Sequence, residues 1–183
     1  GSASVRDEAG REMGRDSLLA VFPMENLSGA AAPMKEIQGA LVDRLKRRGL
    51  RILDEEALEE FFVRHRVRYT AGLSRDLGQA LRRETGVKGV LIGSLELFME
   101  ENPPKMALVL RLVSTGEKPV IRWMDARSMT GNDAPGFLSL GLIRDRRELQ
   151  GKVMAKIVDS LMAYLFNERA KNSRDESSVF MKG

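Results

Sequence analysis

The stretch from Val87 to Glu101, "VKGVLIGSLELFMEE", decides the fold because its hydrophobic pattern changes part-way along it. It begins as a continuous apolar run, which is typical of a strand buried on both faces. It then alternates between two sets of residues, with Leu95, Leu97 and Met99 set against Glu96, Phe98 and Glu100. A period of two belongs to a strand, so we predict a strand here with the two sets on opposite faces.

Two further strands follow after short turns. The segment "KMALVLRLV" at 105–113 comes after the breaker "NPP" and places four apolar residues on one face: Met106, Leu108, Leu110 and Leu112. The turn "STGEKP" contains Gly116 and leads into a third strand, "VIRWMDARSM", at 120–129. Three successive strands joined by short turns predict an antiparallel meander.

Upstream of the meander, short strands alternate with amphipathic helices. "SLLAVFP" at 17–23 predicts a buried strand, and Pro33 opens a helix with an apolar stripe formed by Met34, Ile37, Leu41 and Leu45. "LRILD" at 50–54 predicts a second strand, and Asp54 and Ser74 are typical caps for two more helices. Because helices cross over between the early strands, these strands are predicted to be parallel.

A last helix follows the meander. Asp145 and Glu148 resemble a capping box, and an apolar stripe follows them: Leu149, Val153, Ile157, Leu161 and Leu165. The predicted fold is a single mixed α/β (α+β) domain at 17–166, with a mixed sheet of about five strands, an antiparallel C-terminal meander and about four helices packed on it. Residues 129–143 form a loop insertion. Residues 1–16 are predicted to be a flexible leader, in which Gly1-Ser2 is typical of a tag-removal scar, and 167–183 a polar tail.

Composition sets bounds on function. The 183 residues are 43% apolar and 31% charged, as in an ordinary globular protein. Cysteine is absent, which excludes disulfides and thiolate metal sites, and no apolar run approaches the roughly 20 residues that span a bilayer. A net charge of +4 favours anionic partners. The basic clusters alternate with acidic runs, which is typical of a solvated surface.

No known catalytic or cofactor pattern stands out. His65 is the only histidine, and no nucleophile is placed beside it by a motif; Ser94 lacks the second glycine of a nucleophile elbow. "GVKGVLIG" has neither the Walker spacing nor the G-x-G-x-x-G spacing of phosphate-binding loops. The oxygens of Asp125, Asn132 and Asp133 do not match the ligand spacing of a calcium loop. We therefore predict no enzymatic activity, no cofactor and no metal. A hydrolase is kept as a third alternative.

The segment from Trp123 to Asp145, "WMDARSMTGNDAPGFLSLGLIRD", is the leading candidate for a site. It contains two successive turns followed by a run of apolar residues. It is either a loop that packs its apolar residues back on the domain, or a recognition loop with Trp123 as its anchor. The predicted partner-binding residues are Trp123, Asp125, Asn132, Asp133, Phe137, Leu138, Leu140 and Leu142.

A second candidate surface is the basic stretch "RHRVRYT". Arg64, Arg66 and Arg68 are interleaved with an aromatic residue, a composition found in proteins that bind nucleic acids. No zinc finger, ribonucleoprotein motif or KH loop accompanies it. The alternative function is therefore a cytoplasmic nucleic-acid-binding module that uses a basic patch at these three arginines.

Four segments between Leu18 and Trp123 carry a family resemblance. They are "LLAVFPMENLSG", "LVDRLKRRGLRILD", "LRRETGVKGVLIGSLELF" and "ALVLRLVSTGEKPVIRW". Together they resemble the TolB N-terminal-domain-like group, which includes curli-secretion (CsgG-type) and penicillin-binding-protein-activator lipoproteins. Met24 stands where that pattern has an aromatic residue, and the insertion before the last helix lies outside it. The resemblance brings no binding residues with it, because no matching site motif exists here.

The resemblance implies an exported bacterial protein, often lipid-anchored, that binds other envelope proteins. We therefore predict a non-enzymatic interaction module of the cell envelope, an accessory protein of assembly or secretion. Its predicted location is the periplasm, anchored to the outer membrane by a lipid. Its predicted partners are other envelope proteins and itself as a homo-oligomer, with the membrane reached only through that anchor.

Overall fold

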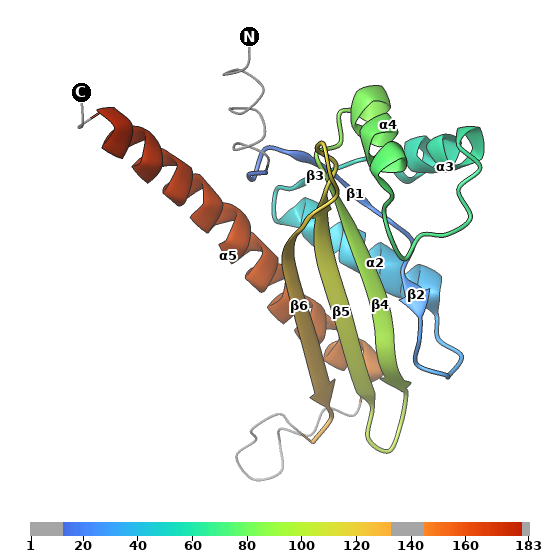
Figure 1. Ribbon diagram of the computed structural model, residues 1–183. Coiled ribbons are helices and arrows are strands. Elements are labelled where there is room, and N and C mark those ends of the chain that lie inside the picture. Colours follow the sequence, from blue (N-terminus) through green and yellow to red (C-terminus); the bar gives the residue numbers. More distant parts are fainter. Residues whose placement is uncertain (1–12, 133–144, 181–183) are drawn as a thin grey trace.

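The computed structural model describes residues 13–132 and 145–180, with side chains as far as Asn167 (Figure 1). Its elements are β1 (Leu18–Val21), β2 (Glu25–Asn26), α2 (Met34–Arg47), β3 (Arg51–Ile52), α3 (Glu55–Arg64), α4 (Arg75–Thr85), β4 (Gly89–Met99), β5 (Lys105–Ser114), β6 (Ile121–Thr130) and α5 (Arg146–Phe180). The predicted order of strands and helices is confirmed, and β2 is added to it.

The strands form one six-stranded mixed sheet, in the order β3-β1-β4-β5-β6 with β2 also paired to β4. β1 is parallel to both β3 and β4, whereas β4, β5 and β6 are antiparallel. The predicted parallel half and antiparallel meander are thus both confirmed. β2 makes the sixth strand because the chain pairs with β4 on both sides of Pro23, which has no N–H to contribute.

Helices lie on both sides of the sheet and create two hydrophobic cores. α2 and α5 cover what we call the inner face, where the larger core contains Leu41, Leu91 and Ile157. α3 and α4 lie on the outer face, where the smaller core contains Phe61, Leu81 and Val90. The continuous apolar run of β4 is explained by this arrangement, since its residues enter both cores in turn.

Predicted helix boundaries are mostly confirmed by local geometry. The Oγ of Ser74 accepts a hydrogen bond from the Leu77 N–H at 3.2 Å, and Gly86 ends α4 with φ of 80°. Asp54 precedes α3 in the cap position, although its side chain makes no capping hydrogen bond. The carboxylate of Asp145 accepts from the Arg147 N–H at 2.9 Å, before α5.

Two glycines of β4 allow close packing on the inner face. A Cβ on Gly89 would lie 2.4 Å from the Met13 sulfur and 3.0 Å from a methyl carbon of Leu112. A Cβ on Gly93 would lie 3.1 Å from Leu110. Gly89 and Gly93 in "GVKGVLIG" are therefore required by the packing of this sheet, whereas Gly86 ends α4.

The predicted alternation along β4 is wrong after Leu95. A β-bulge lies between Leu95 and Leu97, since Leu95 pairs with Leu108 and Leu97 pairs with Ala107. The extra residue, Glu96, shifts the faces by one position. Phe98 is consequently buried in the inner core, whereas Leu97 and Met99 lie on the outer face and are exposed.

The last helix is longer than the sequence predicts. α5 continues to Phe180, through most of the segment predicted to be a polar tail, and runs past the body of the domain (Figure 1). Its apolar stripe from Leu149 to Leu165 is buried against the inner face, as predicted. No helix among the described residues is both long and apolar enough to cross a membrane.

Candidate interaction surface

His65 lies at the end of α3, where it joins α3 to α4. Its Nε2 is 2.6 Å from a carboxylate oxygen of Glu84, and its ring centroid is 4.4 Å from that of Phe61. Partial desolvation raises the pKa of Glu84, but hydrogen bonds from His65 and Arg64 outweigh it and hold the pKa below its ordinary value. Among the described residues, His65 contacts an acid and an aromatic ring but no hydroxyl group, which is the arrangement of a structural cross-link.

The three arginines of the predicted basic patch have different surroundings. Arg64 donates two hydrogen bonds of 3.2 Å to Glu84. Arg66 and Arg68 lie in the loop after α3 and are exposed. Because Arg64 is already paired with a carboxylate, only two of the three cations are available to an anionic partner.

The predicted anchor, Trp123, lies on the inner face of β6. It is half-buried against the larger core, and its indole N–H donates to the Oγ of Ser160 on α5 at 3.3 Å. Asp125, on the same face, accepts from the Arg127 Nε at 2.9 Å. Burial raises the pKa of Asp125, but hydrogen bonds from Ser160 and Arg127 outweigh it and lower the pKa. Both predicted residues therefore help to hold β6 against α5.

The other predicted partner-binding residues lie at or beyond the end of β6. Asn132 is exposed. Asp133, Phe137, Leu138, Leu140 and Leu142 lie outside the described residues, as does most of the predicted loop insertion at 129–143. Their role in binding stays a prediction.

The start of α5 is fixed by ion pairs. Arg146 contacts a carboxylate oxygen of Glu36 on α2 at 2.7 Å and Glu100 at 3.6 Å, and Arg147 contacts the other Glu36 oxygen at 2.9 Å. The hydrogen bond from Arg146 lowers the pKa of Glu36 below its ordinary value. These contacts join α5, α2 and the end of β4.

The outer face of the meander carries exposed apolar side chains. Leu97 and Met99 on β4 and Met124 on β6 are 38%, 42% and 60% exposed. Half-buried Ala107 of β5 pairs with Leu97, and half-buried Val109 is the next outward residue of β5 before Arg111, which pairs with Met124. We call the five apolar residues Leu97, Met99, Ala107, Val109 and Met124 the outer patch. α3 and α4 reach only the other end of this face, where they contact Val90, Ile92 and Val113 (Figure 1). Among the described residues, no helix covers the outer patch.

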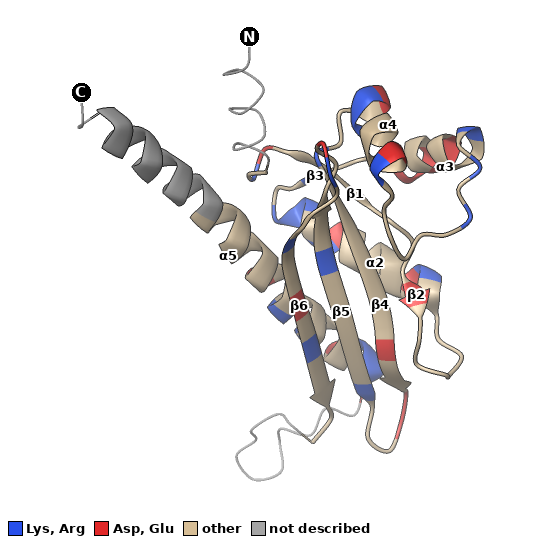
Figure 2. Ribbon diagram, viewed as in Figure 1, with Lys and Arg blue, Asp and Glu red and all other residues tan. Residues whose placement is uncertain are grey.

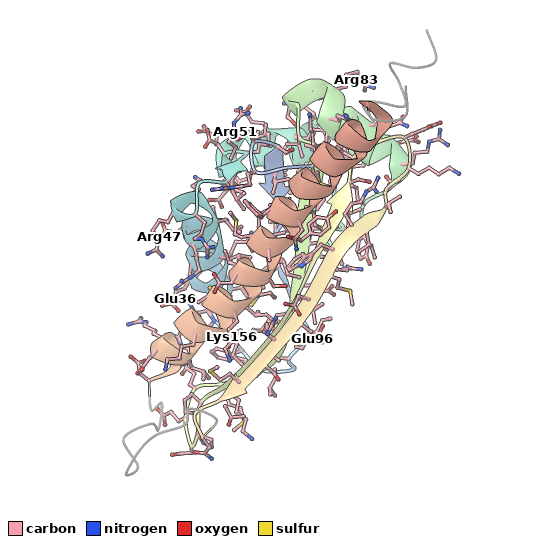
Figure 3. All side chains as sticks on the ribbon, turned by 90° about the vertical axis from the view of Figure 1, so that its left-hand side faces the viewer. Glu36, Arg47, Arg51, Arg83, Glu96 and Lys156 are labelled. Carbon is pink, nitrogen blue, oxygen red and sulfur yellow. The ribbon has the colours of Figure 1, made fainter. Side chains whose placement is uncertain are left out.

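The outer patch was not predicted, because unbroken alternation through β4 places Leu97 on the same face as Leu95. The segment "LELFM" does not reveal the extra residue, since adjacent apolar residues such as Leu97 and Phe98 also occur in a regular strand with a core on each face. Figure 3 shows Glu96, the bulge residue, on the side of the sheet away from α5.

Comparison with known proteins places the fold among bacterial proteins. No protein-family model matches the chain, and no curated protein matches its sequence. Protein CT253 from Chlamydia trachomatis is similar in structure, with a TM-score of 0.58, 12% identity and coverage of 82% of this chain and 98% of that chain. The lipoprotein GNA1162 from Neisseria meningitidis has a TM-score of 0.54 and 17% identity, covering 79% and 99%.

A third similar structure is a PelC dodecamer from Paraburkholderia phytofirmans. Its TM-score is 0.53 at 16% identity, and the match covers 82% of this chain and 91% of that chain. At such identities the likeness shows the fold, which this chain shares with a bacterial lipoprotein. None of the three carries the TolB or curli-channel name, so that finer resemblance stays a prediction.

Proposed function

We propose that this chain is a non-enzymatic protein-interaction module of the bacterial cell envelope, an accessory protein of assembly or secretion. The observation that carries the proposal is the outer patch, because a regular sheet face normally buries its apolar side chains. Exposed apolar residues grouped on one face are typical of a surface that meets another protein.

The shape and chemistry of the patch suit a protein partner. Its side chains stand on three neighbouring strands, and a sheet offers a broad surface that can pack against a second one. Two of its three most exposed residues are methionines, Met99 and Met124, whose flexible side chains adapt to different partners. The fold similarity to a lipoprotein and to a dodecamer supports envelope proteins, or further copies of this chain, as those partners.

The proposed location is the periplasm, with a lipid anchor to the outer membrane. The complete gene gives a direct test, because its product would begin with a signal peptide that ends at a cysteine able to carry the lipid. Fractionation of cells that produce the complete protein should place it in the outer membrane. Recovery in the cytoplasm would overturn the location and favour the nucleic-acid alternative.

Photo-crosslinking in the living bacterium tests the function. Met124 is replaced by a photo-crosslinking amino acid, and exposed Glu59 on α3 is replaced in a matched control. We expect adducts from position 124, but not from position 59, to contain exported envelope proteins or a second copy of the chain. Adducts confined to cytoplasmic proteins, or no difference between the two positions, would contradict the proposal.

A further inference from the structure

The free edge of the sheet differs from its other edge in length. β6 is the last strand in the sheet order and is ten residues long, whereas β3 at the opposite edge has two. No described strand pairs with the outward side of β6. In an antiparallel strand alternate residues direct their N–H and C=O groups to the same side, so about five residues of β6 offer them outward.

α5 lies beside this edge. It packs against β6, runs in the opposite direction, and extends past the strand (Figures 1 and 3). A strand added to β6 would therefore find one of its faces already covered by a helix. Long exposed edges are ordinarily blocked by charges, proline, a bulge or a covering helix. β6 has a bulge at Arg122, near its start, and its Asp125 and Arg127 pair with one another, so the part of the edge after Arg122 is the part left to receive a strand.

Two lysines of α5 give the edge its charge. Glu148, Lys152, Lys156 and Ser160 are spaced by four residues, so they form one row along the helix with two lysines and a single acid, and Ser160 contacts Trp123 on β6. Figure 3 shows Lys156 between α5 and β6. Lys152 and Lys156 are exposed and make no ion pair with any described residue. On β6 itself the Asp125 carboxylate is matched by Arg127.

Figure 2 shows both basic and acidic residues on β6 and on α5, and the basic excess of the strip beside the edge comes from Lys152 and Lys156. We propose that β6 and the Lys152–Lys156 row of α5 form a docking site for an extended acidic segment of a partner protein, which adds a strand to the sheet. Backbone hydrogen bonds to β6 would supply affinity, and the lysines would select carboxylates on alternate residues. This inference rests on the proposed function, because it names the kind of partner segment.

Peptide binding to the full chain tests the docking site. The probe is a ten-residue peptide of five Glu-Val repeats, which matches the length of β6. Trp123 is the only tryptophan and lies on β6, so its fluorescence reports binding at this strand. We expect saturable binding of this peptide, weak binding of a Lys-Val peptide of equal length, and no binding of the Glu-Val peptide with every backbone amide methylated.

Variants identify the edge as the place of binding. The double substitution Lys152→Glu and Lys156→Glu should weaken binding of the Glu-Val peptide about tenfold, the equivalent of roughly 0.7 kcal/mol for each lost surface ion pair. Lys35→Glu with Lys46→Glu, on α2, is the matched control and should leave binding unchanged. Equal weakening by both pairs of substitutions, or equal binding of the methylated peptide, would show charge attraction alone and overturn the proposal.

Sedimentation of the free chain tests whether a second copy of the chain occupies the edge of β6. A dimer whose formation excludes the Glu-Val peptide would show that a second copy takes the edge, and the acidic-segment proposal would be wrong. Loss of peptide binding would not affect the crosslinks expected from Met124, because that side chain lies on the outer face. Failure of the docking site and failure of the proposed function are thus distinguishable.

Discussion

The two faces of the meander contain similar apolar side chains but have opposite environments. On the inner face of β5, Leu108 and Met106 are fully packed beneath α5. On the outer face, Leu97 and Met124 are exposed although they are equally apolar. The residue types of the strands therefore do not by themselves determine which side chains are buried here. The positions of the helices determine it, and α3 and α4 cover only one end of the outer face.

The largest expected effect compares two leucines on these faces. Leu108→Ala should lower the free energy of unfolding by about 2–4 kcal/mol, because it leaves a cavity in the larger core. Leu97→Ala should lower it by less than about 1 kcal/mol, since that side chain is partly in water already. Urea denaturation followed by Trp123 fluorescence measures both. Equal losses would mean that the outer face is covered.

Two glycine-to-alanine substitutions compare a closely packed position with an open one. Gly89→Ala should destabilise by about 1–3 kcal/mol, because its Cβ would enter the space of Met13 and Leu112. Gly39→Ala, in the middle of α2 with nothing within 4 Å of a built Cβ, should stabilise by about 0.5–1 kcal/mol. Thermal unfolding of the two variants gives the signs. A neutral Gly89→Ala would show that Met13 does not hold this packed position.

Deletion of Glu96 tests the bulge that separates the two faces. Removing the extra residue joins Leu95 to Leu97 in an unbroken ladder and leaves Phe98 inward, so the loss of stability should stay within about 1 kcal/mol. Deletion of Leu97 instead would join Glu96 to Phe98 and would also leave one residue of β4 opposite each residue of β5. Its expected consequence is loss of an apolar side chain from the outer patch and reduced crosslinking at position 124. Severe unfolding on deletion of Glu96 would contradict the bulge.

The smallest effect concerns the ion pairs that hold the inner helices together. The pKa of Glu36 is lowered in the folded protein, so its contribution to stability is complete above its unfolded pKa and is lost as pH falls through the folded value. Glu36→Gln should therefore reduce stability by less than about 1 kcal/mol at neutral pH and by nothing at pH values below the folded pKa. Urea denaturation across the acidic range measures this. A difference that persists at the lowest pH would assign the effect to packing.

Much of the fold could be predicted because it depends on local patterns. The stripe of Ile37, Leu41 and Leu45, the cap at Ser74 and the left-handed Gly86 all act within one or two turns of chain. The bulge at Glu96 could not be predicted from period alone, because one extra residue reverses every later position. The contacts of His65 with Glu84 and of Trp123 with Ser160 join residues distant in sequence. The sequence alone indicated neither partner.

Apart from β2 and the end of α5, the order of strands and helices, most of their boundaries, and the parallel and antiparallel halves of the sheet followed from the amino-acid sequence by itself. The hydrophobic period, the helix caps and the turn residues act over short distances along the chain, so they can be recognised in the sequence. Only the tertiary structure decided which faces are covered, that Trp123 turns toward α5, and that β6 is left as a long edge beside a row of lysines. Coverage depends on where a helix from elsewhere in the chain comes to rest, and that position is the joint result of packing across the whole domain.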